Sequence, residues 1–382
     1  MHILDNMVLG KRLEETITTD IQEGKVGGAA VAVMQNGDTV YQNCFANEQL
    51  GINVTENTMF RLASMTKPIT TAAILILIDR GLIDLDMQVS RFIPGFEQMY
   101  IGEVCDDEVR NITPAKTSIT IRHLLSHSSG LGSGPVGVAV SNKFPATERV
   151  SLEKVVEYYS QNPLDFEPYT KQFYSAIHGF DVLARIVEIV AGMPFDEFLR
   201  KEIFMPLGMT ETTFAPNDEQ WKRMIPMHNY AEAEGEGMIA DFSSNTVFGN
   251  IPTSCCCGGA GLASTLIDYK KFASMLLNKG CVQGKQLISE ELICQMSTPQ
   301  VPKSIMNGHV IWGLGVRIVV SEYYKDLPIG SYGWSGAYGS HFWVDPTNNI
   351  TAIYLKNSLY DGGSGAKTAR RFEQIVNQSL IK

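Results

Sequence analysis

The sequence lacks an excess of positive charge and any long apolar run. Its 382 residues include 31 Lys and Arg against 41 Asp and Glu, which gives a net charge of −10. No basic stripe interrupts this acidic balance, which argues against nucleic acid as a partner. No apolar run is long enough to span a bilayer. The composition therefore predicts neither nucleic-acid binding nor a membrane span.

Targeting and cysteine signals are also sparse. Residues 1–6 contain neither a basic n-region nor an apolar h-region, so a chain that begins here is expected to stay in the cytoplasm. The seven cysteines are odd in number and scattered, which does not suggest a disulfide framework. Three of them adjoin at 255–257, but their side chains diverge and no paired Cys-x-x-Cys or nearby His follows. We predict no metal and no cofactor.

The order of local signals predicts an α+β fold with two lobes, because one ordinary core rarely holds this length. A helix is expected at 8–23, a hairpin around Asn36-Gly37, strands at 311–320, 341–344 and 350–355, and a closing helix at 366–380. Helices and loops fill the middle, with a flexible Gly-rich loop at 130–137. We predict one antiparallel sheet from both termini flanked by helices (1–60 plus 250–382), an inserted mainly helical lobe (61–249), and the active site at their seam.

One stretch combines a hydroxyl side chain with a helix that is apolar on every face. Residues 72–78 read Ala-Ala-Ile-Leu-Ile-Leu-Ile, and such a helix is buried inside a large protein. Pro68 suits its first turn, and Gly81 suits its end. The helix should therefore begin near Ser64 and place Lys67 one turn later.

Lys67 is not the residue that helix stability favours at this position. A capping box has Glu or Gln three residues after Ser, and a cation in the first turn opposes the helix dipole. Residues three apart share a helix face, so the Lys67 nitrogen can reach the Ser64 hydroxyl. A buried lysine can accept the serine proton, and the N–H groups at a helix start can bind an oxyanion. The spacing alone is equally compatible with a serine that only caps the helix, and the buried helix behind it favours Ser64 as a nucleophile.

Other motifs have simpler explanations. Ser-x-x-Lys recurs at 151–154 and 364–367, where we interpret it as the start of exposed helices. His123 and His127 lie four apart, but without a His-Glu-x-x-His pattern packing or hydrogen bonding is favoured over metal binding. Residues 333–337 resemble a degenerate nucleophile elbow around Ser335. That motif needs a following helix and an acid then a His downstream, whereas a strand follows and His341 precedes any acid, so we reject it.

Among the 14 tyrosines, Tyr174 lies in a polar turn just before a predicted helix at 179–191. A phenol near a buried lysine is a plausible second base and later acid. Spacing cannot choose among the tyrosines, and packing is the commoner function of such a residue.

Five stretches, in this order, resemble the serine β-lactamases, penicillin-binding proteins and related esterases. They are residues 60–68 (Phe-Arg-Leu-Ala-Ser-Met-Thr-Lys-Pro), residues 121–131, Tyr174-Ser175, residues 258–265, and Trp334-Ser335-Gly336. The nearest branch is the class C β-lactamase-like one, and within it the family VIII carboxylesterases. The resemblance covers nearly the whole chain.

This resemblance implies a set of site residues. Ser64 would be the nucleophile, Lys67 its proton acceptor or electrostatic helper, and Tyr174 the general base and acid. The N–H groups of Ser64 and Ala337 would form the oxyanion hole. The implied substrate-binding residues are Trp334, Ser335, Gly336 and Tyr338.

Two departures from the family pattern bear on the substrate. Ala176 stands where lactamases have the Asn of Tyr-x-Asn, and Trp334 stands where they have a Lys. Both changes disfavour β-lactams and peptides with a free carboxyl end. The expected function is a serine hydrolase that cleaves small-molecule esters through an acyl-enzyme on Ser64. A β-lactamase or D-amino-acid peptidase, an acyltransferase and a covalent sensor that does not turn over remain alternatives, and the oligomeric state stays open.

Overall fold

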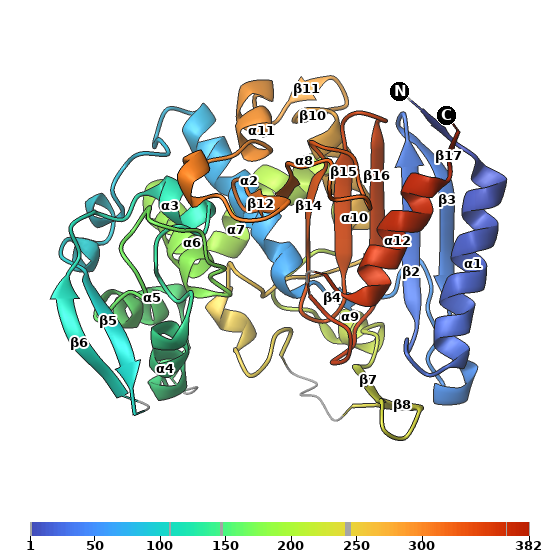
Figure 1. Ribbon diagram of the computed structural model, residues 1–382, viewed down its shortest axis with the longest axis horizontal. Coiled ribbons are helices and arrows are strands. Elements are labelled where there is room, and N and C mark those ends of the chain that lie inside the picture. Colours follow the sequence, from blue (N-terminus) through green and yellow to red (C-terminus); the bar gives the residue numbers. More distant parts are fainter. Residues whose placement is uncertain (1, 107, 146–147, 241–245, 364, 382) are drawn as a thin grey trace.

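A seven-stranded antiparallel sheet forms the right-hand part of the molecule (Figure 1). The computed structural model describes residues 2–106, 108–145, 148–240, 246–363 and 365–381. The strand order is β12-β13-β14-β15-β16-β2-β3, so the predicted sheet built from both termini is confirmed. Its strands are β2 (Ala29–Gln35), β3 (Asp38–Phe45), β12 (Val310–Trp312), β13 (Arg317–Val319), β14 (Tyr332–Ser335), β15 (His341–Asp345) and β16 (Ile350–Leu355).

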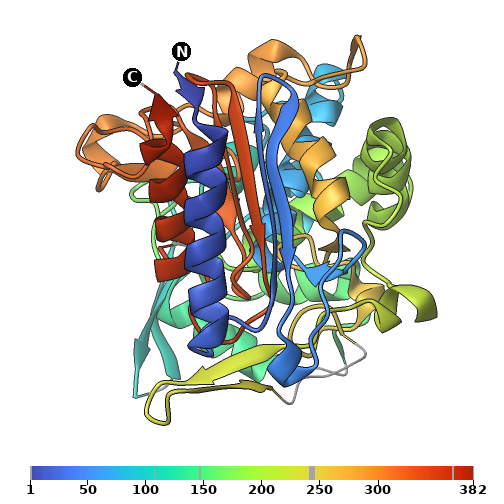
Figure 2. The ribbon, with the colours of Figure 1, turned by 90° about the vertical axis from the view of Figure 1, so that its right-hand side faces the viewer.

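Helices cover both faces of this sheet. Alternate residues of a strand point to opposite faces, and in β2 Val31 and Val33 pack toward α1 (Asn6–Gln22) and α12 (Lys367–Gln378). Figure 2 shows these two helices side by side over one face. On the other face, Ala30 and Ala32 join the larger core together with α10 (Leu266–Leu277). The predicted flanking by terminal helices is confirmed.

The apolar helix found in the sequence is α2 (Thr66–Asp79), which lies at the centre of the molecule (Figure 1). Every residue from Thr66 to Leu77 is buried, as its composition predicted. A short 3₁₀ turn (Ala63–Met65) leads into it, and Pro68 lies in its first turn. The helix packs against α6 (His178–Ala191). Its apolar surface is therefore covered by other parts of the protein, α6 among them.

The remaining elements complete the chain. The other helices are α3 (Ile121–Leu125), α4 (Pro135–Lys143), α5 (Leu152–Ser160), α7 (Phe195–Leu199), α8 (Met205–Leu207), α9 (Asp218–Lys222) and α11 (Glu290–Met296). The short strands are β1 (Ile3–Leu4), β4 (Phe60–Arg61), β5 (Tyr100–Cys105), β6 (Glu108–Pro114), β7 (His228–Ala231), β8 (Glu236–Ile239), β9 (Ala263–Ser264), β10 (Cys281–Val282), β11 (Lys285–Gln286) and β17 (Leu380–Ile381). Within the described ranges, no helix combines the length and apolar character that crossing a membrane requires.

Several local predictions were wrong. The single strand expected at 311–320 is the hairpin β12–β13, because the chain turns where the Gly313 N–H donates to the Val316 carbonyl at 2.9 Å. The expected flexible loop contains α4, which Pro135 begins. The hairpin β5–β6 was not foreseen, because most of its residues are at least partly exposed and carry no apolar alternation. By contrast, Ser151 caps α5 as expected; Ser364 lies outside the described residues.

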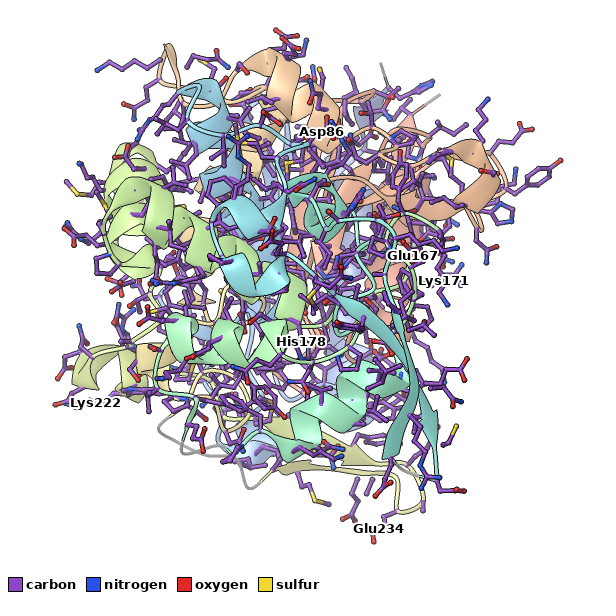
Figure 3. All side chains as sticks on the ribbon, turned by 90° about the vertical axis from the view of Figure 1, so that its left-hand side faces the viewer. Asp86, Glu167, Lys171, His178, Lys222 and Glu234 are labelled. Atoms are coloured by element: carbon purple, nitrogen blue, oxygen red, sulfur yellow. The ribbon has the colours of Figure 1, made fainter. Side chains whose placement is uncertain are left out.

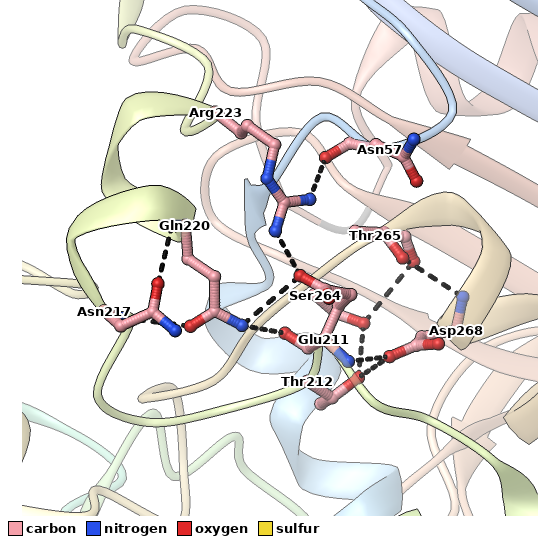
Figure 4. Close-up of polar contacts among 9 residues, drawn as sticks. All are labelled: Asn57, Glu211, Thr212, Asn217, Gln220, Arg223, Ser264, Thr265 and Asp268. Atoms are coloured by element: carbon pink, nitrogen blue, oxygen red, sulfur yellow. Dashed lines mark hydrogen bonds and ion pairs between the residues drawn. The ribbon is translucent and has the colours of Figure 1, made fainter.

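Polar contacts fix the segment that precedes Ser64. In the pairing of β4 with β9, Phe60 lies opposite Ser264. The Ser264 hydroxyl is 2.7 Å from Thr212 Oγ1, which donates to Asp268 Oδ2 on α10 at 3.1 Å (Figure 4). Hydroxyl and carboxylate groups thus tie the partner strand of residues 60–61 to α10.

The burial of α2 predicts a large cost of truncation. Ile74 is 0% exposed, so Ile74→Ala leaves a cavity and should lower the free energy of unfolding by about 2–5 kcal/mol in urea titrations. The matched control is Ile189→Ala on α6, because Ile189 is 38% exposed and its truncation should cost about 1 kcal/mol or less. Equal losses in both variants would contradict the central position of α2.

Candidate active site

Ser64, Lys67 and Tyr174 lie in direct contact. Lys67 Nζ donates to Ser64 Oγ at 3.2 Å, and the Tyr174 hydroxyl donates to the same oxygen at 2.7 Å. The first contact follows from the spacing on one helix turn. The second joins residues 110 positions apart, which only the tertiary fold brings together.

The Lys67 ammonium is fully buried and held by two backbone carbonyls. Nζ donates to the Ala176 carbonyl at 2.6 Å and to the Gly259 carbonyl at 2.8 Å. With Ser64 Oγ, these acceptors match the three N–H donors of a protonated lysine. Lys67 therefore faces Ser64 as a hydrogen-bond donor, in a position fixed by two separate loops.

The backbone around Ser64 is unusual. Ala63 has φ of +46°, in the left-handed region that residues other than Gly rarely adopt. Such strain persists only where the surrounding structure imposes it, and it is frequent next to reactive groups. The Ser64 side chain itself is mostly buried, with 8% of its residue surface exposed.

The end of β14 approaches the Ser64 turn closely. A Cβ on Gly336 would lie 2.2 Å from the Leu62 carbonyl oxygen, so only glycine fits there. Ala337 follows directly. Among the described residues, neither the Ser64 N–H nor the Ala337 N–H donates a hydrogen bond within the protein. Two free donors on adjoining turns are the arrangement that an oxyanion requires.

Aromatic rings form one side of the site. We call Tyr174, Trp312 and Trp334 the aromatic wall. The ring centroids of Tyr174 and Trp312 lie 5.3 Å apart with nearly parallel planes, and Trp334 lies 4.1 Å from Trp312 and 5.2 Å from Tyr174. Trp334 thus lies against the Tyr174 ring, and this side of the site offers apolar surface to a ligand.

His127 packs behind the aromatic wall as a neutral ring. Its centroid lies 4.2 Å from Trp312 and 4.9 Å from Tyr174, and its Nδ1 accepts the Ser175 N–H at 3.0 Å. Burial, and then the nearby Lys67, hold the pKa of this imidazole well below its ordinary value. The prediction that His127 serves in packing and hydrogen bonding is confirmed.

Ser335 and Tyr338 are placed differently from Trp334. Ser335 alternates with Trp334 on β14, so its hydroxyl lies on the opposite sheet face, 2.8 Å from His341 Nδ1. His341 Nε2 lies 3.0 Å from Glu373 on α12. Tyr338 lies beside the loop 248–251, where its hydroxyl accepts the Gly249 N–H at 3.0 Å.

The Ser335, His341 and Glu373 side chains form a chain that resembles a hydrolase triad, although the sequence argument rejected an elbow here. All three are at most 2% exposed. Burial, and then the cation of Arg317, lower the pKa of His341 well below its ordinary value, and Arg317 also pairs with Glu373. These three hydrogen-bonded side chains connect β14 and β15 to α12 in the interior of the protein.

A buried carboxyl group lies one peptide unit from Lys67. Asp181 on α6 is 1% exposed, and it accepts the Gly259 N–H and the Tyr159 hydroxyl, each at 3.4 Å. The Gly259 carbonyl in turn accepts Lys67. Burial raises the pKa of Asp181 to about 6, an effect that its hydrogen bonds and Lys67 oppose only in part.

This shifted pKa predicts a pH-dependent stability difference. Because the folded-state pKa of Asp181 is about 6 against an ordinary 3.8, its contribution to stability is complete below the ordinary value and is lost as the pH rises through about 6. Asn cannot ionise, so Asp181→Asn should gain melting temperature relative to wild type at about pH 8 compared with about pH 4.5. Thermal unfolding at both pH values measures this, with the exposed Asp38→Asn as control. A gain that is the same at both values would contradict the assignment.

Sequence reasoning did not identify several residues of the site. Trp312, and the carbonyls of Ala176 and Gly259 as lysine acceptors, have no sequence signal, since any residue supplies a carbonyl and a lone Trp on a strand is typical of a core. The Gly258-Gly259 pair was a partial signal, because a Cβ on either would meet the backbone of α6 or of the turn before it.

Comparisons with known proteins agree with this geometry. Protein Rv1367c of Mycobacterium tuberculosis is 29% identical over 357 residues, which cover 87% of this chain and 86% of that protein. Esterase EstB of Burkholderia gladioli is 27% identical, covering 96% of this chain and 94% of the esterase. The solved structure of EstCE1, described as a hydrolase with promiscuous acyltransferase activity, has the same fold, with a TM-score of 0.79 at 23% identity, over 97% of this chain and 99% of that one. The model of the Beta-lactamase family matches residues 13–376, and the protein therefore belongs to this family of serine hydrolases, within the superfamily that its motifs resemble.

Proposed function

We propose that this serine hydrolase cleaves small-molecule carboxylic esters through an acyl-enzyme on Ser64. The observation that carries the proposal is the position of Ser64 Oγ, which both Lys67 Nζ and the Tyr174 hydroxyl contact. As it attacks a carbonyl, a serine hydroxyl in contact with an amine and a phenol can lose its proton to whichever of the two is deprotonated. The site lies where α2 meets the Gly259 loop, and we propose that this is the seam between a sheet lobe and a helical lobe.

Tyr174 is the better placed of the two proton acceptors. Two carbonyls hold the Lys67 nitrogen in place, and in its protonated form this nitrogen has no lone pair for the serine proton. The Lys67 nitrogen lies 5.0 Å from the centre of the Tyr174 ring, so both side chains face the same serine hydroxyl. In this mechanism Tyr174 takes the Ser64 proton while Lys67 stabilises the negative charge.

The reaction then balances in two steps. Ser64 Oγ bonds to the acyl carbon, and the N–H groups of Ser64 and Ala337 bind the oxyanion that forms. The intermediate breaks its bond to the alcohol oxygen, which receives the proton held by Tyr174. In the second step, water gives a proton to Tyr174 and attacks the acyl carbon, and Ser64 leaves with that proton. A carboxylic acid and the free enzyme are the products.

The aromatic wall supports esters over β-lactams and D-amino-acid peptides. Trp334 offers an apolar ring where a lysine would hold a substrate carboxylate, and Ala176 has no amide to bond a substrate amide. The 27% identity to an esterase over most of both chains supports the same choice. Binding on this side should depend on apolar contact with the leaving alcohol.

Removal of the nucleophile tests the proposal directly. Ser64→Ala should abolish turnover of p-nitrophenyl butyrate, and wild type should cleave the β-lactam nitrocefin little, both followed by absorbance. Turnover that survives in Ser64→Ala but is lost in Ser335→Ala would move the nucleophile to the buried chain behind the sheet. Strong nitrocefin cleavage by the wild type would instead favour a β-lactamase.

The role of Tyr174 has its own test. Tyr174→Phe keeps the ring in the aromatic wall and removes the hydroxyl, so kcat should fall by about 10²–10⁴-fold while KM changes little. The matched control is Tyr323→Phe, because Tyr323 is 70% exposed. An unchanged kcat in Tyr174→Phe would leave Lys67 as the base, and Lys67 would then have to act in its neutral form.

A second candidate is acyl transfer to an alcohol other than water. Ser64 is 8% exposed beside the aromatic wall, which restricts water near an acyl-enzyme and favours apolar acceptors. Measured in the presence of a short alcohol, the ratio of new ester to free acid distinguishes transfer from hydrolysis. A ratio above that set by the molar fraction of the alcohol would favour the transferase.

A further inference from the structure

A cavity of about 310 Å³ adjoins the candidate active site. Ala176 lines it, and the carbonyl of this residue accepts Lys67 at 2.6 Å. Phe248 lines the other side, with its ring centroid 5.5 Å from that of Tyr338, the residue after Ala337. We call this space the α4 cavity, because α4 contributes to its wall. Its volume suits a small ligand group.

A cationic side chain lines the α4 cavity. Arg149 is the cation among the described residues that line it, and none of these is Asp or Glu. Among the described residues, Arg149 has no carboxylate within ion-pair distance. The chain has a net charge of −10, yet among its described residues the carboxylic acid whose pKa Arg149 lowers is the buried Asp181, which forms no ion pair with it. The guanidinium can therefore accept an anion that arrives with a ligand.

The Arg149 guanidinium is positioned but not saturated. Its carbon lies 5.1 Å from the centre of the Phe144 ring, and its Nη2 donates to the Ser141 carbonyl at 3.4 Å. A guanidinium has five N–H donors, so several remain for a ligand. Stacking on Phe144 limits the directions in which they point.

The other polar groups in the α4 cavity are neutral. His178 is labelled in Figure 3, which views the side of the molecule that carries α4 and α5. Burial, and then the charge of Arg149, lower the pKa of His178 to about 3, and its Nε2 lies 3.1 Å from Ser141 Oγ. Val138, Ile177 and Ile251 supply apolar surface. The cavity thus combines one cation with a lining that suits methylene groups.

We propose that Arg149 binds a carboxylate at the far end of the substrate's acyl chain, so that half-esters of short dicarboxylic acids are preferred substrates. The inference rests on the proposed ester hydrolysis. The leaving alcohol must lie within reach of the Tyr174 hydroxyl, beside the aromatic wall, where the Lys67 nitrogen is already bonded to Ser64 and to two carbonyls. The acyl chain then extends past Ala176 into the α4 cavity, where Arg149 meets its terminal charge.

The test compares two esters of equal chain length, mono-p-nitrophenyl glutarate and p-nitrophenyl pentanoate. Wild type should show a higher kcat/KM for the glutarate ester, and added salt should reduce the preference. Arg149→Met should lower the ratio of the two kcat/KM values by about tenfold or more, because the charge and its bidentate bonds are both lost. Arg149→Lys should lower the ratio by less, because it keeps the charge and loses only the bidentate bonds. Arg91→Met, at an exposed arginine of another segment, is the matched control.

Three results would overturn the proposal. They are a wild-type ratio at or below one, an unchanged ratio in Arg149→Met, and an equal fall in Arg91→Met. A further pair, 4-carboxyphenyl pentanoate and phenyl pentanoate, places the charge on the alcohol instead. If Arg149→Met lowers only the ratio of this second pair, the assignment of the acyl chain to the α4 cavity is wrong.

A binding measurement separates this proposal from the ester chemistry. Titration calorimetry of glutarate into Ser64→Ala should give binding that is lost in Ser64→Ala/Arg149→Met. Glutarate binding in a protein that cleaves no ester would support the anion site and overturn the proposed reaction. Ester cleavage that needs Ser64, without glutarate binding, would support the proposed reaction and overturn the anion site.

Discussion

The burial of the Lys67 ammonium is the constraint on which the rest of the site depends. An unpaired charge in the interior is costly, and carbonyl acceptors at good distance reduce that cost. Here the acceptors are Ala176, just before α6, and Gly259, in the loop that leads to β9. Both loops must therefore keep their positions for Lys67 to remain buried. Because Lys67 also donates to Ser64, the same contacts fix the position of the Ser64 hydroxyl.

This arrangement also explains why polar groups gather behind an apolar helix. Asp181 is held beside Gly259, and its charge favours the ammonium that the same peptide unit contacts. Burial opposes that charge, so the site keeps a carboxyl whose ionisation costs stability at neutral pH. Such local conflicts are typical of functional sites, where stability is given up for a fixed arrangement of charges.

The two sides of the site differ in character, and the substrate proposals follow from that difference. The aromatic wall offers rings, and the Lys67 nitrogen beside Tyr174 is already bonded to Ser64 and to two carbonyls. The described lining of the α4 cavity offers apolar groups and the charge of Arg149. The expected preference for esters over β-lactams reflects the first side, and the proposed carboxylate at the end of the acyl chain reflects the second. In β-lactamases the lysine at the position of Trp334 suits a substrate carboxylate. In this protein we expect the substrate carboxylate in the α4 cavity instead.

The sequence by itself determined what depends on near neighbours in the chain: the buried helix α2, the Ser64 and Lys67 pair on one helix turn, and the hairpin at Asn36-Gly37. Hydrophobic periodicity and turn chemistry act over a few residues, so these features can be predicted. Which of 14 tyrosines meets Ser64 was decided by the tertiary structure, because only folding closes the 110 residues between them. The same holds for the lysine acceptors and for Ser335, whose side of the sheet depends on strand register. Backbone carbonyls carry no sequence signal, and one residue of register reverses a strand's faces.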